Sequence, residues 1–251
     1  MKKEKLFLSV VIPAYNEEDN VKNGALNQVN SYLSSQKYSW EVLVVDDGSK
    51  DKTVELAEKY AKDHAGFVVL KEPHRGKAGT LIAGMLHAGG GIVLFTDMDQ
   101  ATPIEEVEKL LPKFNEGKDI VIGSRSGREG APFVRKLMAF GFSVLRAIIL
   151  RLPYKDTQCG FKAFTHDASS EIFKRMKIFS DKKRAEGAAV NAGFDLELLY
   201  IARKLGMKVS EVPVEWHHQG TIRVDPIRDS ISGLTDMLRV RLNALQGKYK
   251  V

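Results

Sequence analysis

A short apolar run that ends abruptly in two aspartates constrains this chain more than any other stretch. Residues Ile92–Phe95 have the composition of a strand buried on both faces, and Asp97 and Asp99 follow at once. In an extended chain, residues two apart point to the same side, so we expect both carboxylates to leave the strand end together. Anions held this close repel each other, and a divalent cation with oxygen ligands would relieve that repulsion. Taken alone, the pair could equally be a solvated turn.

Apolar runs of this kind alternate with segments of helical periodicity along the first half of the chain. Strands are expected at residues 6–12, 40–45, 67–70, 92–95 and 119–122. The first helix is expected to start at Glu17, with Asn16 as its cap, and further helices fill the gaps between the strands. The alternation predicts an α/β fold with a mostly parallel sheet covered by helices on both faces. Ligands of such sheets bind beyond the carboxyl ends of the strands, where this chain carries its polar clusters.

The second half of the chain combines longer helices with fewer strands. Residues 133–152 form the most apolar segment and are expected to be helical, and another helix is expected at residues 194–205. Val212, Val214 and Trp216 alternate with polar residues, which predicts a strand with one buried face. A basic amphipathic helix is expected at residues 226–251, and a mobile loop at residues 180–191.

Composition and charge narrow the class of protein. The net charge of +6 favours anionic partners, which include nucleotides, phosphates, an acidic membrane surface and nucleic acid. The single cysteine, Cys159, excludes a disulfide framework and a cysteine-rich metal site. A membrane-spanning helix needs about 20 mostly apolar residues, whereas the longest uninterrupted apolar run covers residues 137–145. We therefore expect a cytoplasmic protein with no membrane-spanning helix and no signal peptide.

Two common phosphate-binding motifs are missing. No glycine-rich fingerprint follows the first expected strand, which argues against a dinucleotide-binding fold. The Gly76-Lys77 pair is followed by Ala78, and Lys71 stands where a P-loop requires glycine, so that match fails as well.

Motifs in both halves of the chain carry a resemblance to a known family. In the first half they are Val11-Ile-Pro-Ala-Tyr-Asn-Glu17, Val44-Val-Asp-Asp-Gly-Ser49, Arg75-Gly-Lys-Ala-Gly79 and Asp97-Met-Asp99. Their order and spacing resemble the signature set of the inverting family 2 glycosyltransferases. In the second half they are Gly123-Ser-Arg125, Asp156-Thr-Gln-Cys-Gly-Phe-Lys162, Phe194-Asp-Leu-Glu-Leu-Leu-Tyr200 and Glu211-Val-Pro-Val-Glu-Trp216. These are similar to the polyprenyl-phosphate branch, whose members transfer glucose or mannose to dolichyl phosphate.

The resemblance implies a GT-A fold and a metal-dependent transfer of a hexose with inversion. Residues 1–225 would form the catalytic domain, with a nucleotide-sugar half at 1–125 and an acceptor half at 126–225, and residues 226–251 would form a basic C-terminal helix. The donor would be a UDP- or GDP-hexose, with UDP-glucose preferred. The acceptor would be a polyprenyl or dolichyl phosphate at a membrane surface, with no nucleic acid partner.

Two alternatives stay open beside this hypothesis. One is a transferase of the same fold that uses GDP-mannose or UDP-GlcNAc and acts on a soluble or other lipid or saccharide acceptor. The other is a non-catalytic protein that binds nucleotide sugars. A sugar-nucleotide pyrophosphorylase is disfavoured, because its glycine-rich motif after the first strand is missing.

The resemblance also implies donor-side roles for single residues. The nucleoside would be framed by residues after the first two strands, namely Pro13, Ala14, Tyr15, Glu17, Asp46, Asp47, Gly48 and Ser49. Among these, Asp46 or Asp47 would hold the uracil or the ribose, and Lys77 would approach the diphosphate. The Asp97-Met98-Asp99 motif would face the donor. Its two aspartates would bind Mg²⁺ or Mn²⁺, which neutralises the departing diphosphate.

One position departs from the mannose synthases of that branch. They often add a third metal ligand, a glutamine two residues past the second aspartate, where this chain has Ala101. Its glutamine is Gln100, which would point the other way in an extended chain. The third ligand therefore stays open, and the departure favours the glucosyltransferase pattern.

The acceptor side is expected to bind a phosphate. A lipid phosphate is already an anion at neutral pH, so it needs orientation more than a strong base. Arg125 and Arg135, with Lys162, would hold its oxygens, although Arg135 could be only a surface charge. Asp156 could act as the base if the acceptor were a sugar hydroxyl.

The expected helix at residues 133–152 is apolar over more than one face. We expect its second face to rest in a lipid interface, where arginines meet anionic headgroups at about 1 kcal/mol each. The alternative is that the C-terminal helix or a partner chain covers this face. On the first interpretation the protein is peripherally attached to a membrane.

Overall fold

A computed structural model describes residues 6–125, 133–178, 193–217 and 226–249 of the chain. Its centre is a seven-stranded sheet with the strand order β3-β2-β1-β4-β6-β5-β7. The strands are β1 (Leu8–Ala14), β2 (Trp40–Asp46), β3 (Phe67–Lys71), β4 (Ile92–Phe95), β5 (Ile120–Arg125), β6 (Lys162–Thr165) and β7 (Val209–Val214). Only β6 runs antiparallel to its neighbours, β4 and β5. The mostly parallel sheet predicted from the sequence is therefore confirmed.

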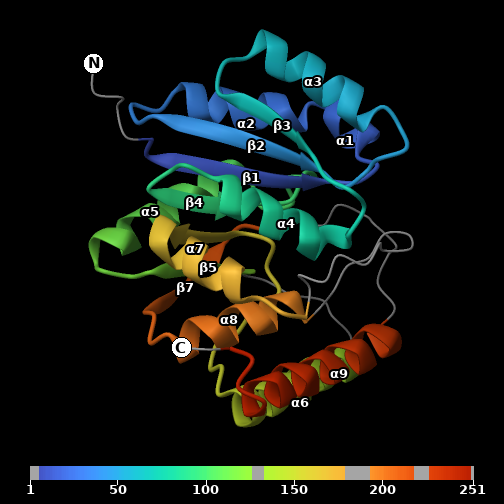
Figure 1. Cartoon of the computed structure of the whole chain (residues 1–251), viewed down its shortest axis with the longest axis vertical. Helices are drawn as coiled ribbons and strands as arrows, with labels where there is room; N and C mark the ends of the chain where they lie inside the picture. The colour runs from blue at the N-terminus through green and yellow to red at the C-terminus, as the bar shows by residue number, and fades with distance from the viewer. Residues whose placement is uncertain (1–5, 126–132, 179–192, 218–225, 250–251) are drawn as a thin grey trace.

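Helices cover both faces of this sheet. They are α1 (Glu18–Lys22), α2 (Ala25–Ser34), α3 (Thr53–Asp63), α4 (Gly76–His87), α5 (Val107–Asn115), α6 (Phe133–Leu150), α7 (His166–Arg175), α8 (Phe194–Lys204) and α9 (Pro226–Leu245), with a short 3₁₀ turn η1 (Ile104–Glu106) before α5. Figure 1 shows α4 and α7 in front of the sheet and α2 and α5 behind it.

The core is split by the sheet into two apolar layers, because successive strand residues point to opposite faces. In β1, Val11 joins the layer under α4, α7 and α8, whereas Val10 and Ile12 join the layer under α2 and α5. All three side chains are fully buried. The two faces of β1 thus explain why the strand is apolar throughout rather than alternating.

Two helix boundaries differ from the sequence predictions. The segment predicted as one helix from Glu17 is two helices, because Gly24 takes a left-handed φ of 89° between them. Asn16 does not cap α1; it has a φ of 54°, and its Oδ1 accepts a hydrogen bond from the Lys50 amide at 2.8 Å. The helix predicted to reach residue 152 ends at Leu150, where Arg151 takes a φ of 54°.

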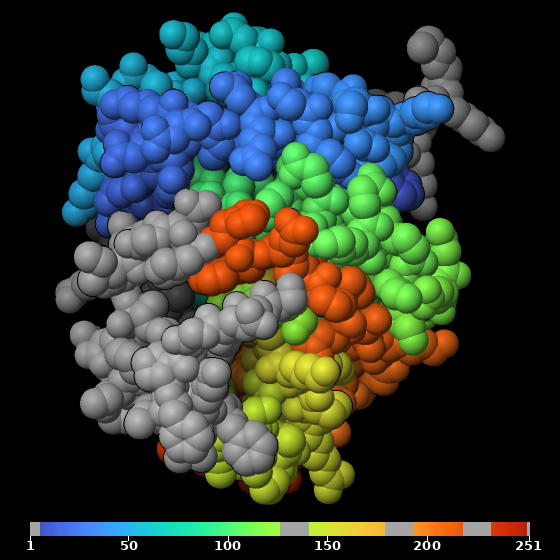
Figure 2. All heavy atoms as spheres, turned by 180° about the vertical axis from the view of Figure 1, so that it is seen from behind, coloured from blue at the N-terminus to red at the C-terminus, as the bar shows by residue number. Residues whose placement is uncertain are grey.

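The helices α6 and α9 pack against each other below the sheet (Figure 1). Seen from behind, the orange residues around β7 lie between the blue N-terminal residues and the yellow-green residues of α6 (Figure 2). No helix within the described ranges has the length and hydropathy that a bilayer crossing requires. The loop predicted at residues 180–191 lies outside the described residues. One sheet runs through both proposed halves, and the division into halves stays a prediction.

Candidate functional site

The motifs of the first half meet at one edge of the sheet, where the parallel strands β1, β2 and β4 end. Ala14 at the end of β1 is in register with Asp46 at the end of β2. The Asp47 amide donates to the Ala14 carbonyl at 2.8 Å, and the Thr96 amide donates to the Val11 carbonyl at 3.1 Å. Segments that lie more than thirty residues apart in sequence therefore form one surface, as predicted for a parallel sheet.

Asp46 shapes the turn that follows β2. It is buried, and its Oδ2 accepts hydrogen bonds from the amides of Gly48 at 2.9 Å and Ser49 at 3.1 Å. Gly48 has a φ of 72°, and a Cβ there would lie 3.2 Å from the His74 amide nitrogen. The turn thus needs glycine for both its conformation and its close packing.

Asp47 ties this turn to the segment before α4. Its Oδ1 accepts a hydrogen bond from the Arg75 amide at 2.7 Å, and its Oδ2 lies 2.8 Å from His74 Nδ1. The His74 ring in turn stacks on Tyr15, with ring centroids 4.2 Å apart and planes within 9°. Both aspartates that the sequence assigned to the uracil or ribose therefore have partners within the protein.

The other predicted nucleoside residues lie around the end of β1. Pro13 belongs to the strand, Ala14 is buried at its end, and Tyr15 is half-buried. The Glu17 amide donates to Thr53 Oγ1 at 2.7 Å, which anchors the start of α1 to α3. Pro13, Ala14 and Tyr15 thus lie beside the Asp46 turn, and their role in framing a nucleoside stays a prediction.

The chain does not stay extended after β4, so that part of the sequence argument was wrong. The Gln100 amide donates to the Asp97 carbonyl at 3.2 Å, and Gln100 has a φ of 49°, which closes a turn over the two aspartates. Asp99 Oδ1 accepts a hydrogen bond from the Ala101 amide at 3.0 Å. Met98 between the aspartates is buried in the core rather than exposed to a donor.

Asp97 is held between a lysine and a glycine from distant segments. Its Oδ1 forms an ion pair with Lys77 Nζ, and its side chain remains 35% exposed. A Cβ on Gly160 would collide with the Asp97 carboxylate, so this carboxylate lies directly against the Gly160 backbone. The sequence placed Gly160 inside a motif but gave it no role, since only the fold brings it to Asp97.

Lys162 lies in an adjoining buried cluster. Its side chain is fully buried, and its Nζ donates to Asp195 Oδ1 at 2.6 Å and to the Cys159 carbonyl. The ammonium also lies 5.3 Å from the centroid of the Phe95 ring. Lys162 was predicted to bind the acceptor phosphate, but this geometry turns its charge inward to Asp195.

Asp195 is a site residue that sequence reasoning missed. It lies in the first turn of α8, and burial raises the pKa of its carboxyl, against the opposing effects of Lys162 and Lys77. Burial alone would lower the pKa of Lys77, but Asp97, together with Asp195 and Asp99, raises it. The four charged side chains Lys77, Asp97, Lys162 and Asp195 therefore form one electrostatic unit. An acidic residue at the start of a helix was the available signal.

The residues around Asp97 fit a divalent metal ion. Burial and the neighbouring Asp97 raise the pKa of the Asp99 carboxyl, because its negative charge is unfavourable there. A bound cation would stabilise that charge. Gln100 adds a buried Oε1 that has no hydrogen-bond partner. Among the described residues there is no cluster of three or more His, Cys, Asp or Glu side chains. A hard cation would therefore complete its ligands with diphosphate oxygens and water.

The predicted acceptor residues Arg125 and Asp156 form a bidentate ion pair. Arg125 Nε lies 2.6 Å from Asp156 Oδ2, and Nη2 lies 2.9 Å from Oδ1. Burial would lower the pKa of Arg125, but the bonded Asp156 raises it. The guanidinium lies over the ring of Trp216 at 5.7 Å. Arg135 belongs to α6, but its side chain lies outside the described part of the structure.

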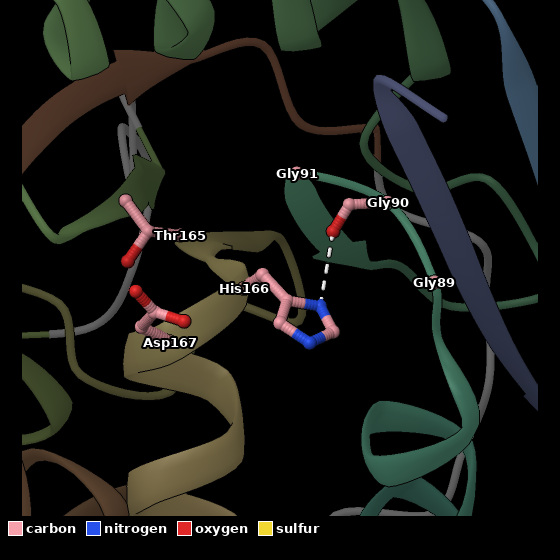
Figure 3. A pocket seen from close by; sticks show the side chains of 6 residues that line it. All are labelled: Gly89, Gly90, Gly91, Thr165, His166 and Asp167. Carbon is pink, nitrogen blue, oxygen red and sulfur yellow. Dashed lines mark hydrogen bonds between the residues drawn. The ribbon is translucent and has the colours of Figure 1, made fainter. Parts of the chain in front are cut away.

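Two small cavities lie at opposite ends of the strands. One of about 290 Å³ adjoins the ion pair and is lined by Ser124, Arg125, Lys155, Glu211 and Pro213. Another of about 240 Å³ lies at the opposite edge, between residues 89–91 and the start of α7 (Figure 3). There His166 Nδ1 lies 3.2 Å from the Gly90 carbonyl. None of the predicted site residues lines this second cavity.

Comparison with known proteins identifies the family. The sequence model described as glycosyl transferase family 2 matches residues 9–173. The chain belongs to this family. As a family 2 glycosyltransferase it has the GT-A fold that the resemblance implied, and the prediction of a glycosyltransferase is confirmed.

Related proteins match nearly the whole of this glycosyltransferase. A dolichyl-phosphate beta-glucosyltransferase of Trichomonas vaginalis is 35% identical over 98% of this chain and 76% of its own length. The protein of the same name from Homo sapiens is 32% identical over 97% of this chain and 78% of its own length.

Solved structures share the fold at lower identity. Mannosyl-3-phosphoglycerate synthase from Rubrobacter xylanophilus has a TM-score of 0.68 at 20% identity, and the match covers 98% of this chain and 76% of that one. Glucosyl-3-phosphoglycerate synthase from Mycobacterium tuberculosis, in complex with Mn²⁺, UDP and its product, has a TM-score of 0.64 at 20% identity over 94% and 80%.

Proposed function

We propose that this family 2 glycosyltransferase transfers glucose from UDP-glucose to a polyprenyl phosphate such as dolichyl phosphate, with inversion and with Mg²⁺ or Mn²⁺. The names of its full-length relatives support the glucose and the dolichyl phosphate, and a neighbour solved with UDP and Mn²⁺ is consistent with the donor and the metal. The observation that carries the proposal is the paired placement of Asp97 and Asp99 at the edge where β1, β2 and β4 end.

On the donor side, the protein supplies a rigid frame. Asp46 and Asp47 hold the turn after β2 and the segment before α4, which leaves Tyr15 and the backbone around it to contact the nucleoside. Asp97 and Asp99 would hold the metal, which acts as a Lewis acid and neutralises the leaving diphosphate. Lys77, now paired with Asp97, lies where its ammonium can also reach a diphosphate.

On the acceptor side, the ion pair suits a phosphate better than a sugar hydroxyl. A phosphate oxygen attacks as an anion and needs no strong base, and Asp156 is already bonded to a guanidinium. Arg125 Nε and Nη2 hold that carboxylate, and a guanidinium carries more N–H donors than one carboxylate accepts. Arg125 therefore orients the acceptor, and Asp156 fixes Arg125.

The location we propose is the surface of a membrane, contacted by α6 and α9. We define the outer face as Val144, Leu145 and Ile148 of α6 with Leu234, Leu238, Leu242 and Leu245 of α9, all exposed, up to 70% for Ile148 and Leu245. The leucines recur at helical spacing on the side of α9 opposite the buried Met237 and Val240. α9 packs along α6 without covering these three α6 side chains.

Charge favours a lipid surface as the occupant of the outer face. Exposed Arg239, Arg241 and Lys248 lie on the same helix or directly after it, and the acid between the leucines, Asp236, is buried. Cations beside an apolar stripe suit an anionic membrane. Arg146 of α6 is buried and points into the protein.

A reconstitution with defined lipids tests the proposal. The purified full chain is incubated with UDP-glucose, Mn²⁺ and phosphatidylcholine vesicles that contain polyprenyl phosphate, with and without phosphatidylserine. We expect glucosyl-phosphoryl-polyprenol as product, and flotation with the vesicles that strengthens with phosphatidylserine. Transfer to 3-phosphoglycerate without transfer to polyprenyl phosphate would contradict the acceptor assignment. Full activity on the lipid without any flotation would contradict the membrane surface.

A further inference from the structure

Arg146 is a buried cation on a helix whose other face is apolar and exposed. Its side chain is only 4% exposed. Nη1 donates to Thr157 Oγ1 at 3.2 Å, and Nη2 donates to Ser143 Oγ at 2.9 Å and to the Tyr154 carbonyl. Its Nε is buried without a hydrogen-bond partner. Within the described residues, all of its hydrogen-bond acceptors are neutral.

Burying a guanidinium against neutral acceptors costs free energy, which nearby negative charges can offset. Burial lowers the pKa of Arg146, while the nearby charges of Glu211 and Asp156 oppose that effect. Asp156 belongs to the loop after α6 and Glu211 belongs to β7, so neither carboxylate is on α6 itself. The charges of Glu211 and Asp156 therefore favour the charged form of Arg146, whereas its position is set by its hydrogen bonds to Ser143, Tyr154 and Thr157.

Asp156 lies in the loop whose residues Tyr154 and Thr157 accept hydrogen bonds from Arg146. Glu211 of β7 accepts hydrogen bonds from the Lys155 amide at 2.9 Å and from the Asp156 amide at 2.7 Å, which fixes one side of the loop. Arg146 fixes the other side through Tyr154 and Thr157. Between these anchors, Asp156 points to Arg125 and forms the bidentate pair.

We infer that Arg146 is a positioning residue for the acceptor site: it clamps residues 154–157 to α6 and thereby sets the place of Asp156 and Arg125. The helix that presents the apolar outer face is thus mechanically joined to the arginine that orients the acceptor phosphate. The effect of Arg146 on catalysis rests on the proposed function. The structural coupling between Arg146 and Arg125 does not.

The first test reads the position of Arg125 without any substrate. The chain has two tryptophans, so Trp40→Phe leaves Trp216, beneath Arg125, as the sole emitter. In this background we expect Arg146→Met to change the emission maximum and acrylamide quenching of Trp216 in the same direction as Arg125→Met does. Arg151→Met, at an exposed arginine five residues further on, is the matched control and should leave both unchanged.

The second test separates acceptor from donor in steady-state kinetics. Arg146→Met should raise KM for polyprenyl phosphate at least about tenfold, as expected for lost hydrogen bonds from a charged group, with KM for UDP-glucose changed less than about twofold. Arg146→Lys should recover part of the loss, because it keeps the charge. Thr157→Val should shift the same KM in the same direction by a smaller factor.

Distinct outcomes separate failure of this inference from failure of the proposed function. An unchanged Trp216 signal in a folded Arg146→Met protein would overturn the coupling, whatever the substrate. Equal increases in both KM values, or a lower melting temperature with both KM values unchanged, would reduce Arg146 to a structural role. If the wild-type chain does not use polyprenyl phosphate, the proposed function fails, and the Trp216 comparison still decides the coupling.

Discussion

The edge formed by the ends of β1, β2 and β4 and the outer face of α6 and α9 are built in opposite ways. At the strand edge, several predicted polar side chains have a partner from a distant segment, as Asp47 has in Arg75 and Asp97 has in Lys77, whereas Asp46 and Asp99 accept hydrogen bonds from amides of their own turns. On the outer face, seven large apolar side chains are between 37% and 70% exposed. The proposed donor site is thus preorganised by the protein itself, whereas the outer face leaves apolar surface that the described residues do not cover.

The most direct test of this difference between the two regions is to remove one charge from the strand edge. We expect Asp97→Asn to lower kcat at least about a hundredfold, because metal charge neutralisation contributes several kcal/mol. It should also abolish the Mn²⁺-dependent thermal stabilisation by UDP-glucose, which at 100 times its Kd would be about 2.7 kcal/mol. Asp167→Asn, at an exposed acid of the opposite edge, is the control. Near-normal turnover by Asp97→Asn would end the metal-site hypothesis.

Preorganisation itself can be tested without removing a functional group. We expect Gly160→Ala to lower kcat by up to about a hundredfold, because the added Cβ must displace the Asp97 carboxylate, and a displacement of this kind costs that much in rate. Gly89→Ala, whose Cβ would meet its nearest neighbour at an ordinary 3.6 Å, should behave as wild type. Matching kinetics of the two variants would show that the placement of Asp97 is not critical.

Substitutions on the outer face should reduce binding to vesicles rather than turnover. Leu238→Glu with Leu242→Glu removes two side chains whose burial would contribute at most roughly 1.5–3 kcal/mol each, so vesicle flotation should fall more than tenfold. Activity on a short-chain, water-soluble polyprenyl phosphate should stay unchanged. Leu86→Glu, at a leucine of α4 that is 42% exposed, should leave flotation unaffected. If Leu86→Glu lost as much flotation as the double variant, lipid binding would not be specific to the outer face.

The smallest expected effect concerns Asp236, a buried acid beneath the outer face. Burial raises the pKa of Asp236 above its unfolded value of about 3.9, although Arg239 and the Gly193 amide oppose this. The raised pKa favours the protonated folded form, so the stability contribution of Asp236 is full below about pH 4 and is lost as pH rises through its folded pKa.

Asp236→Asn should therefore gain melting temperature relative to wild type as pH rises from 4 to 7. The difference between the two proteins should vanish near pH 4. Asp63→Asn, at an exposed position on α3, provides the comparison and should show no such trend. A difference for Asp236→Asn that is constant with pH would show that its charge is not destabilising.

Much of the fold was predictable because its signals are local. Apolar strands of four to seven residues and a helix after each strand depend on residues near one another, whereas the break at Gly24 was not predicted. The motifs that predict the donor residues are also local in sequence, and the roles of those residues stay predictions. The turn at Asp97–Gln100 was missed because a positive φ at a glutamine has no sequence signature.

The sequence by itself determined a mostly parallel α/β sheet, the family and the strand edge where a nucleotide sugar would bind. Only the tertiary structure decided which charges face the protein and which remain for a ligand. Lys162 turned inward to Asp195, thirty-three residues away, and Arg125 joined Asp156, thirty-one residues away. The physical reason is that a buried charge takes the nearest compensating group in space, and the folded sheet, not the order of the chain, sets which group that is.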